Sequence, residues 1–289
     1  MINSVSNNKT CVLILHFGSL PKWFDLWKYT AKLNPEIDFL IFQDDRETVR
    51  EENIYLIRDS LEGINALPRM KAQGWHVDSF YKLCDLRPAL AYILEDKIQN
   101  YTYWGWGDLD VFYGNILSVL GDSFGKYDYI ATGRDGQSGP LAFLRNSPEI
   151  NSLWRKIDMH SIINDAENHY AADEVAFLDL LKENASCDIN FRECLDDLPA
   201  QWTNGHLIGR NGREHALFHF GGRLKHSQKQ IGDASDNIIQ GMRKTGGFEI
   251  LQNYRIVHLT RNPAITFSKT FYFNLRRSLA RFHKSMVQS

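Results

Sequence analysis

The chain has 289 residues, of which 43% are hydrophobic and 24% are charged, and its formal net charge is -2. This composition is typical of a folded globular protein, and the near-neutral charge argues against a protein whose whole surface binds nucleic acid. The length allows one large or two small domains, and we expect one main domain over residues 1–250 and an extension over residues 251–289.

The spacing of the cysteines and the lengths of the apolar runs indicate the cellular compartment of the protein. Cys11, Cys84, Cys187 and Cys194 are widely spaced and form no Cys-x-x-Cys pair. We therefore expect neither a disulfide framework nor a thiolate zinc site. The first residues lack the basic start and apolar run of a secretory signal, and nowhere do about 18 apolar residues follow one another. We expect a cytoplasmic protein without a membrane span.

The first part of the chain predicts a β-α-β unit. Residues 10–17 form a nearly continuous apolar run, typical of a strand buried on both faces, and residues 37–42 form a second one. Between them, residues 23–33 have the apolar spacing of a helix. In open α/β sheets, ligands bind beyond the carboxyl ends of the strands. The residues expected there, in a nucleotide pocket, are Phe17, Gly18 and Asp44.

Strands and helices are predicted to alternate further along. The strand-like ranges are 53–57, 101–106, 127–132 and 140–144. Helical spacing covers residues 78–94, with a bend at Pro88, and residues 172–181. This alternation predicts an α/β layered fold with a Rossmann-type mixed sheet flanked by helices.

Asp108 and Asp110 form an Asp-x-Asp motif directly after an aromatic, apolar segment. In an extended backbone, residues i and i+2 point the same way, so both carboxylates can face one cation. Such oxygen ligands suit Mg²⁺ and Mn²⁺, which often complete their shell with substrate phosphates. The alternative is a solvated turn. Unpaired carboxylates at the end of a buried strand, however, are costly without a cation.

A second cluster lies at residues 219–225. His219 can supply an imidazole ligand, and Gly221 and Gly222 permit close approach of the backbone to a phosphate. Lys225 can offset negative charge on a departing diphosphate. The alternative is a core histidine beside a glycine turn.

In their order and spacing, these blocks resemble glycosyltransferases. The pattern His-Phe-x-Gly-x-x-Lys over residues 219–225 resembles the signature that follows the Asp-x-Asp motif in retaining glycosyltransferases of sequence family 8, whose fold is GT-A. Residues 81–85 and 104–114 look still more like bacterial polysaccharide and lipopolysaccharide glycosyltransferase-like proteins. The resemblance implies that residues 1–250 are a GT-A-like catalytic domain.

The resemblance also implies roles for single residues. Asp108, Asp110 and His219 would hold Mn²⁺ or Mg²⁺ together with the diphosphate of a nucleotide-sugar donor, which we expect to be UDP-linked. The acceptor would be a hydroxyl group of a cell-surface glycan or of a lipid-linked molecule. The expected nucleotide-sugar-binding residues are Phe17, Gly18, Asp44, Lys82, Asp85, Asp108, Gly222 and Lys225.

Asp173 and Glu174 open an apolar helix and are the candidate catalytic residues. In an inverting enzyme, one carboxylate would act as a general base on the acceptor hydroxyl, and in a retaining enzyme it would orient the acceptor or the donor sugar. A plain role at the helix N-terminus is the alternative.

Two other functions stay open. One is a metal-dependent nucleotidyltransferase or phosphohydrolase, although the chain has no P-loop motif. The other is a non-catalytic carbohydrate-binding protein.

The extension over residues 251–289 is basic and aromatic, with no acidic residue after Glu249. As an amphipathic helix it can rest on an anionic membrane surface, which suits an enzyme on the inner face of the plasma membrane. The alternative is a terminal helix packed on the main domain. We expect no nucleic-acid partner, because no nucleic-acid-binding motif accompanies the charge.

Overall fold

The computed structural model describes residues 9–137, 139–194, 197–221, 231, 236, 238–240, 243, 247–250 and 256–258. Its main sheet has eight strands in the order β3-β4-β2-β1-β5-β8-β7-β9. These strands are β1 (Thr10–Leu15), β2 (Ile37–Gln43), β3 (Val49–Glu51), β4 (Ile54–Arg58), β5 (Tyr103–Gly107), β7 (Tyr129–Ala131), β8 (Leu141–Arg145) and β9 (Cys187–Asp188).

The sheet is mixed. Strands β4, β2, β1 and β5 run parallel to one another. At one edge β3 is antiparallel to β4, and on the other side β8 is antiparallel to both β5 and β7. The four central parallel strands therefore all point their carboxyl ends at one edge of the sheet, which is the usual ligand edge of such folds.

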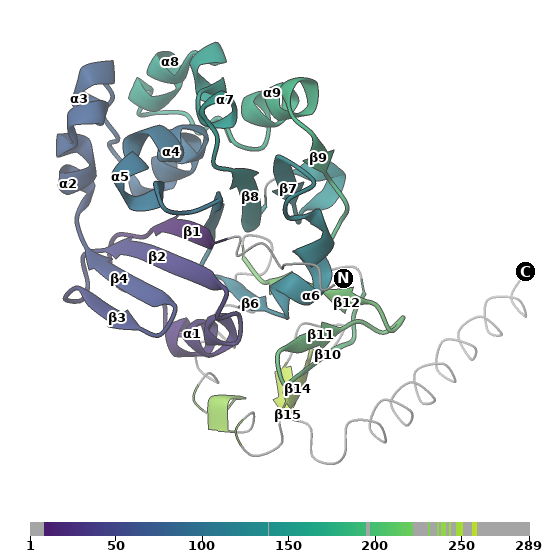
Figure 1. Cartoon of the computed structure of the whole chain (residues 1–289). Coiled ribbons are helices and arrows are strands. Elements are labelled where there is room, and N and C mark those ends of the chain that lie inside the picture. The colour runs from purple at the N-terminus through teal and green to yellow at the C-terminus, as the bar shows by residue number, and fades with distance from the viewer. Residues whose placement is uncertain are drawn as a thin grey trace, which may run out of the picture.

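Helices lie on both faces of this sheet (Figure 1). The α-helices are α1 (Phe24–Lys32), α2 (Leu61–Ala66), α3 (Pro68–Gln73), α4 (Leu90–Ile93), α5 (Glu95–Ile98), α6 (Ile116–Leu120), α7 (Pro148–Asn151), α8 (Met159–Asn164) and α9 (Ala176–Asn184). The 3₁₀ helices are η1 (Phe80–Ala89), η2 (Gly121–Ser123), η3 (Arg134–Gly136) and η4 (Leu153–Lys156).

Each face of the sheet has its own core. Along β1, Cys11 and Leu13 pack into one cluster, with Trp104 and Trp106 of β5. The alternate residue Val12 packs into another, around α1. Burial on both faces explains why the strand is apolar at nearly every position rather than at every second one.

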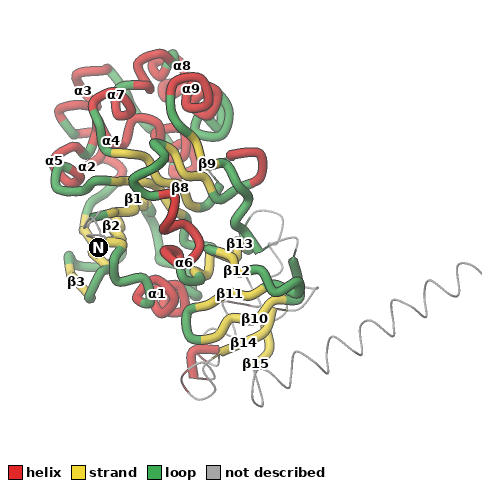
Figure 2. The backbone as a smooth tube through the Cα atoms, turned by 45° about the vertical axis from the view of Figure 1, so that its right-hand side comes forward, coloured by secondary structure: helices red, strands yellow, loops and turns green. Residues whose placement is uncertain are grey.

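A smaller antiparallel sheet lies beside the main one, next to β13 (Figure 2). It has the order β12-β11-β10-β14-β15. Its strands are β10 (Ala200–Thr203), β11 (His206–Ile208), β12 (Glu214–His215), β14 (Gly247–Ile250) and β15 (Ile256–His258). A separate pair joins β6 (Val111–Tyr113) to β13 (Leu217–His219). Phe112, Phe218 and Phe220 share a core with Trp202 and Phe248, so this pair connects to the small sheet.

The expected fold class, a mixed α/β sheet flanked by helices, is confirmed. Two expected helices differ in detail. Residues 78–94, expected as a helix or a pair of helices, form the 3₁₀ helix η1, which contains Pro88, and directly after it α4. Helix α9 begins at Ala176, after the expected residue 172, because the N–H groups of Glu174 and Val175 bond to the carbonyl of Ala171 in a preceding turn.

Within the described residues, we find no helix with the length and apolar character needed to span a bilayer. All four cysteines are free thiols. Of the extension over residues 251–289, the structure describes only β15, which pairs with β14. The amphipathic helix expected further on lies outside the described residues.

Candidate functional site

Asp108 and Asp110 lie in the bend between β5 and β6. They were expected in an extended segment, but the chain turns here, and the turn is held by helix α1. The indole N–H of Trp23 donates to the carbonyl of Leu109 at 2.7 Å, and that of Trp27 donates to the carbonyl of Asp108 at 3.2 Å. The motif therefore has a backbone shape that the surrounding fold imposes.

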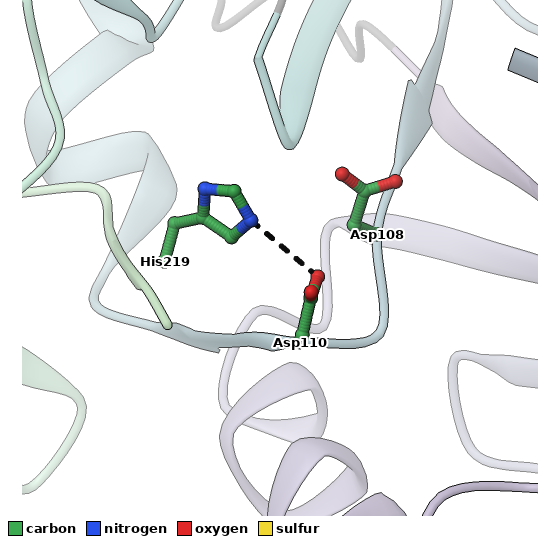
Figure 3. Close-up of side chains that lie close together, drawn as sticks. All are labelled: Asp108, Asp110 and His219. Atoms are coloured by element: carbon green, nitrogen blue, oxygen red, sulfur yellow. Dashed lines mark ion pairs between the residues drawn. The ribbon is translucent and has the colours of Figure 1, made fainter. Parts of the chain in front are cut away.

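His219 reaches this bend through the pairing of β13 with β6. The register places His219 opposite Val111, and the N–H of Phe220 donates to the carbonyl of Asp110 at 3.0 Å. His219 Nε2 lies 3.5 Å from Asp110 Oδ1, and Asp108 faces the same space (Figure 3). One ligand atom from each of the three side chains lies within 4.8 Å of the others. The structure thus brings together the three residues expected to bind metal.

Gly221 lies directly behind this cluster. A β-carbon built on it would stand 1.9 Å from Asp110 Oδ2 and 2.6 Å from His219 Nε2. Any larger residue would displace both side chains. The sequence predicted that Gly221 and Gly222 permit close approach of the backbone to a phosphate, and the structure shows that Gly221 leaves room for the cluster itself.

Arg87 of η1 is a site residue that the sequence reasoning missed. Its guanidinium donates to the carboxylate of Asp108 and, at 2.9 Å, to that of Asp173. Burial alone would lower the pKa of Arg87, but Asp108 and Asp173 raise it well above its ordinary value, so the group stays charged. The signal was present, because Arg87 is the single arginine of the segment 78–94, and η1 also carries Lys82 and Asp85.

Negative charge nevertheless dominates the site. Burial and the charges of Asp110 and Asp173 raise the pKa of Asp108, against the opposing effect of Arg87. Burial and Asp173 likewise raise the pKa of Glu174. Carboxylates raise one another's pKa when they are crowded beyond the available positive charge. The oxygen and imidazole donors of Asp108, Asp110 and His219 therefore fit a hard divalent cation, which would relieve this repulsion.

The two candidate catalytic acids differ in exposure. Asp173 is only 2% exposed and is ion-paired with Arg87. Glu174 is half-buried, and its carboxylate accepts a hydrogen bond from the N–H of Gly139. Neither side chain caps helix α9. Glu174 is thus the one that a substrate can reach.

Lys82 and Asp85 are buried and face the segment between α8 and α9, residues 165–175. Lys82 Nζ lies 3.1 Å from Asp85 Oδ2 and donates to the carbonyl of Asn168 at 2.6 Å. Asp85, fully buried, accepts hydrogen bonds from the N–H groups of Tyr170 and Ala172. The pair thereby fixes segment 165–175 against η1.

Phe17, Gly18 and Asp44 meet at the carboxyl ends of β1 and β2. The N–H of Gly18 donates to Asp44 Oδ1 at 2.7 Å, and the ring of Phe17 lies 6.3 Å from that of Phe80. Beside them, a cavity of about 90 Å³ is lined by residues that include His16, Phe80, Arg87 and Asp108. Typical ligand pockets measure about 300–1,000 Å³, so this cavity takes only part of a nucleotide sugar.

Two expected phosphate-binding residues, Gly222 and Lys225, lie outside the described residues.

Comparison with known proteins gives a family and several similar folds. A model described as "Family of unknown function (DUF6625)" matches residues 12–269. No curated protein matches the chain.

Three solved structures are distantly similar to the chain. A glycosyltransferase involved in the glycosylation of the major capsid of PBCV-1 is 14% identical, with a TM-score of 0.44, over 78% of this chain and 98% of that one. The galactosyltransferase LgtC, in complex with donor and acceptor sugar analogs, is 13% identical, with a TM-score of 0.35, over 58% and 70%. The apo-form glycosyltransferase GlyE of Streptococcus pneumoniae TIGR4 is 12% identical, with a TM-score of 0.37, over 63% and 45%. Similarity this distant leaves the function to be argued from the site.

Proposed function

The chain belongs to DUF6625, a family of unknown function, and we propose that it is a metal-dependent glycosyltransferase that moves a sugar from a nucleotide-sugar donor to an acceptor hydroxyl. The observation that carries this proposal is the convergence of Asp108, Asp110 and His219 within 4.8 Å, at the ligand edge of a mixed sheet. We take the donor to be UDP-linked. The acceptor is a hydroxyl of a cell-surface glycan or of a lipid-linked molecule.

In this proposal, Asp108, Asp110 and His219 would hold Mn²⁺ or Mg²⁺. The ion supplies positive charge that offsets the negative charge growing on the departing diphosphate. Phe17, Gly18 and Asp44 contact the nucleotide, because they meet at the carboxyl ends of β1 and β2, and Phe17 lies near Phe80, which lines the small cavity that reaches Asp108. We keep Gly222 and Lys225 as phosphate contacts.

Arg87 and Asp173 act as a unit. The guanidinium is shared between Asp108 and Asp173, so it fixes the direction of the Asp108 carboxylate and stays charged beside the donor. Because Asp173 is buried, it positions Arg87 and does not touch the acceptor. Glu174 is left as the carboxylate that orients the reacting sugar or takes the acceptor proton.

Lys82 and Asp85 support the site indirectly, through segment 165–175. Their buried ion pair holds segment 165–175, which leads directly into Asp173 and Glu174. Precise placement of reacting groups accounts for much of the rate enhancement of enzymes, so this support matters for turnover. We place the enzyme in the cytoplasm, on the inner face of the membrane that carries its acceptor.

The test is turnover of a panel of nucleotide sugars by the full chain, with Mn²⁺ or with a chelator. We expect release of an intact nucleoside diphosphate, dependent on the metal. Release of pyrophosphate or of a nucleoside monophosphate would instead support phosphoryl chemistry. No turnover and no metal-dependent binding of any nucleotide would favour a non-catalytic protein.

A matched pair of variants tests whether the activity depends on the cluster of Asp108, Asp110 and His219. Asp110→Asn removes one charge from the cluster, and we expect it to abolish metal-dependent turnover. Asp96→Asn makes the same change on a side chain that is 69% exposed in α5, and we expect full activity. Circular dichroism checks that both variants fold. Full activity of a folded Asp110→Asn protein contradicts the proposal.

A further inference from the structure

Three exposed aromatic side chains gather beside the acidic site. Tyr81 is 69% exposed, Phe80 is 54% exposed and Tyr170 is 44% exposed. Within the part of the chain that the structure describes, they are the large aromatic residues that stand out into solvent. Phe80 and Tyr81 begin η1, and Tyr170 lies in segment 165–175. Clustered exposed apolar side chains usually mark a binding surface.

This surface is rigid rather than a set of loose side chains. The ring of Tyr81 lies 4.3 Å from the ring of His169. Lys82 Nζ lies 4.7 Å from the centre of the Tyr170 ring, and the Tyr170 hydroxyl donates to Asp165 at 2.6 Å. A ligand that binds to side chains already held in place loses less affinity to ordering them.

The aromatic surface is continuous with the acidic site. Helix η1 begins with Phe80 and Tyr81 and later supplies Arg87. Segment 165–175 presents Tyr170 and then leads to Glu174. Phe80 also lines the cavity that Arg87 and Asp108 line. Both segments that carry the aromatic surface therefore also carry residues of the acidic site.

The chemistry of the surface differs on its two sides. Phe80 is on the donor side, because it lies near Phe17 and its ring atom Cε2 is 3.8 Å from where a β-carbon of Gly18 would be. Tyr81, His169 and Tyr170 lie along the other side, where two segments meet. Aromatic rings with polar tips pack against the apolar C–H face of a pyranose while its hydroxyl groups stay hydrogen-bonded.

We propose that Tyr81, His169 and Tyr170 form an acceptor platform, which binds a sugar ring of a glycan acceptor by stacking. This inference rests on the proposed transferase function, because it assigns the second substrate of the same site. It also specifies that the part of the acceptor in contact with the platform is a carbohydrate. A transferase needs a second binding surface that holds the acceptor hydroxyl against the donor.

The experiment measures binding of the full chain to an array of bacterial-surface oligosaccharides, with and without UDP and Mn²⁺. Four proteins are compared: wild type, Tyr81→Ala, Tyr81→Phe and Val49→Ala. Tyr81→Phe keeps the ring. Val49→Ala removes another exposed apolar side chain, 44% exposed on edge strand β3. Because Tyr81 is mostly exposed, its replacement should leave the fold intact.

We expect wild type, Tyr81→Phe and Val49→Ala to bind the same oligosaccharides, and Tyr81→Ala to bind them at least tenfold more weakly. The platform is disproved if wild type binds no oligosaccharide, or if Tyr81→Ala binds as well as wild type. It is also disproved if Tyr81→Ala loses affinity for UDP with Mn²⁺, because the ring would then stack on the nucleobase. Failure of the proposed transferase function would be seen in the separate turnover assay, in which no nucleoside diphosphate would be released from any nucleotide sugar.

Discussion

Arg87 and Asp173 form an ion pair of 2.9 Å across 86 positions of sequence. The same guanidinium contacts Asp108, so one cation connects η1, the Asp-x-Asp bend and the segment that ends at Glu174. Three parts of the site depend on this side chain for their relative positions.

Replacing Arg87 with methionine should destabilise the protein by about 3 kcal/mol, since it removes the cation that pairs with the buried carboxylate of Asp173. Urea unfolding measures the loss. The double variant Arg87→Met with Asp173→Asn should be more stable than the single variant, because the buried charge of Asp173 is removed together with the cation that paired with it. If the change in the free energy of unfolding of the double variant equals the sum of the changes of the two single variants, the two side chains are not coupled as described.

Gly221→Ala should weaken Mn²⁺ binding at least tenfold while the fold persists. The added methyl group would stand 1.9 Å from Asp110 Oδ2, so the carboxylate must move. Isothermal titration calorimetry measures the affinity. Gly121→Ala is the matched control, because a β-carbon there meets no atom within 4 Å. Equal Mn²⁺ affinity in the two variants would show that Gly221 does not limit the site.

Glu174→Gln and Asp173→Asn should affect different quantities. Glu174→Gln keeps the size of an accessible side chain and removes its charge, so we expect a loss of about 10²-fold or more in kcat with little change in stability. Asp173→Asn weakens a buried ion pair, so we expect a lower free energy of unfolding as well as lower turnover. Steady-state kinetics and urea unfolding on both variants separate the two roles. A Glu174→Gln enzyme with normal kcat contradicts the assignment.

The pH dependence of stability should include a contribution from Asp188. Burial opposes ionisation, but hydrogen bonds from Arg192 and Ser123 lower the pKa of this carboxyl to about 2. A folded-state pKa below the unfolded one stabilises the protein above the unfolded value, and that stability is lost as the pH falls. From the usual value of 3.8 to about 2, the contribution is about 2 kcal/mol.

Urea unfolding of wild type and of Asp188→Asn tests this at pH 7 and at pH 3. The difference between the two proteins should be largest at pH 7 and should shrink by pH 3. A difference that does not change with pH would mean that Asp188 acts through packing and not through its charge.

The sequence predicted the elements in which the order of apolar and polar residues follows a strong pattern. The two-sided burial of β1 and β2 leaves apolar runs that only a central strand explains. The nearness of His219 to Asp110 was also expected, although its cause was not. It comes from pairing of β13 with β6, strands of three residues that carry too little pattern to be recognised.

What could not be predicted depends on contacts between distant segments. Arg87 looked like one basic residue in a helix until its partners Asp108 and Asp173 were placed. Asp173 and Glu174 were indistinguishable in sequence, and only burial separates them. The small sheet escaped notice because its strands are short and because a long stretch of chain separates β12 from β14.

The two indole hydrogen bonds from Trp23 and Trp27 have a consequence for how quickly the site can work. A bend anchored by the indole rings of Trp27 in α1 and of Trp23, the N-cap of α1, does not have to find its shape after a ligand arrives, so binding of the proposed ion would not wait for the backbone to rearrange. The same anchoring carries a vulnerability. A substitution that disturbs the first turn of α1, far in sequence from Asp108 and Asp110, would misalign the carboxylates of these two residues.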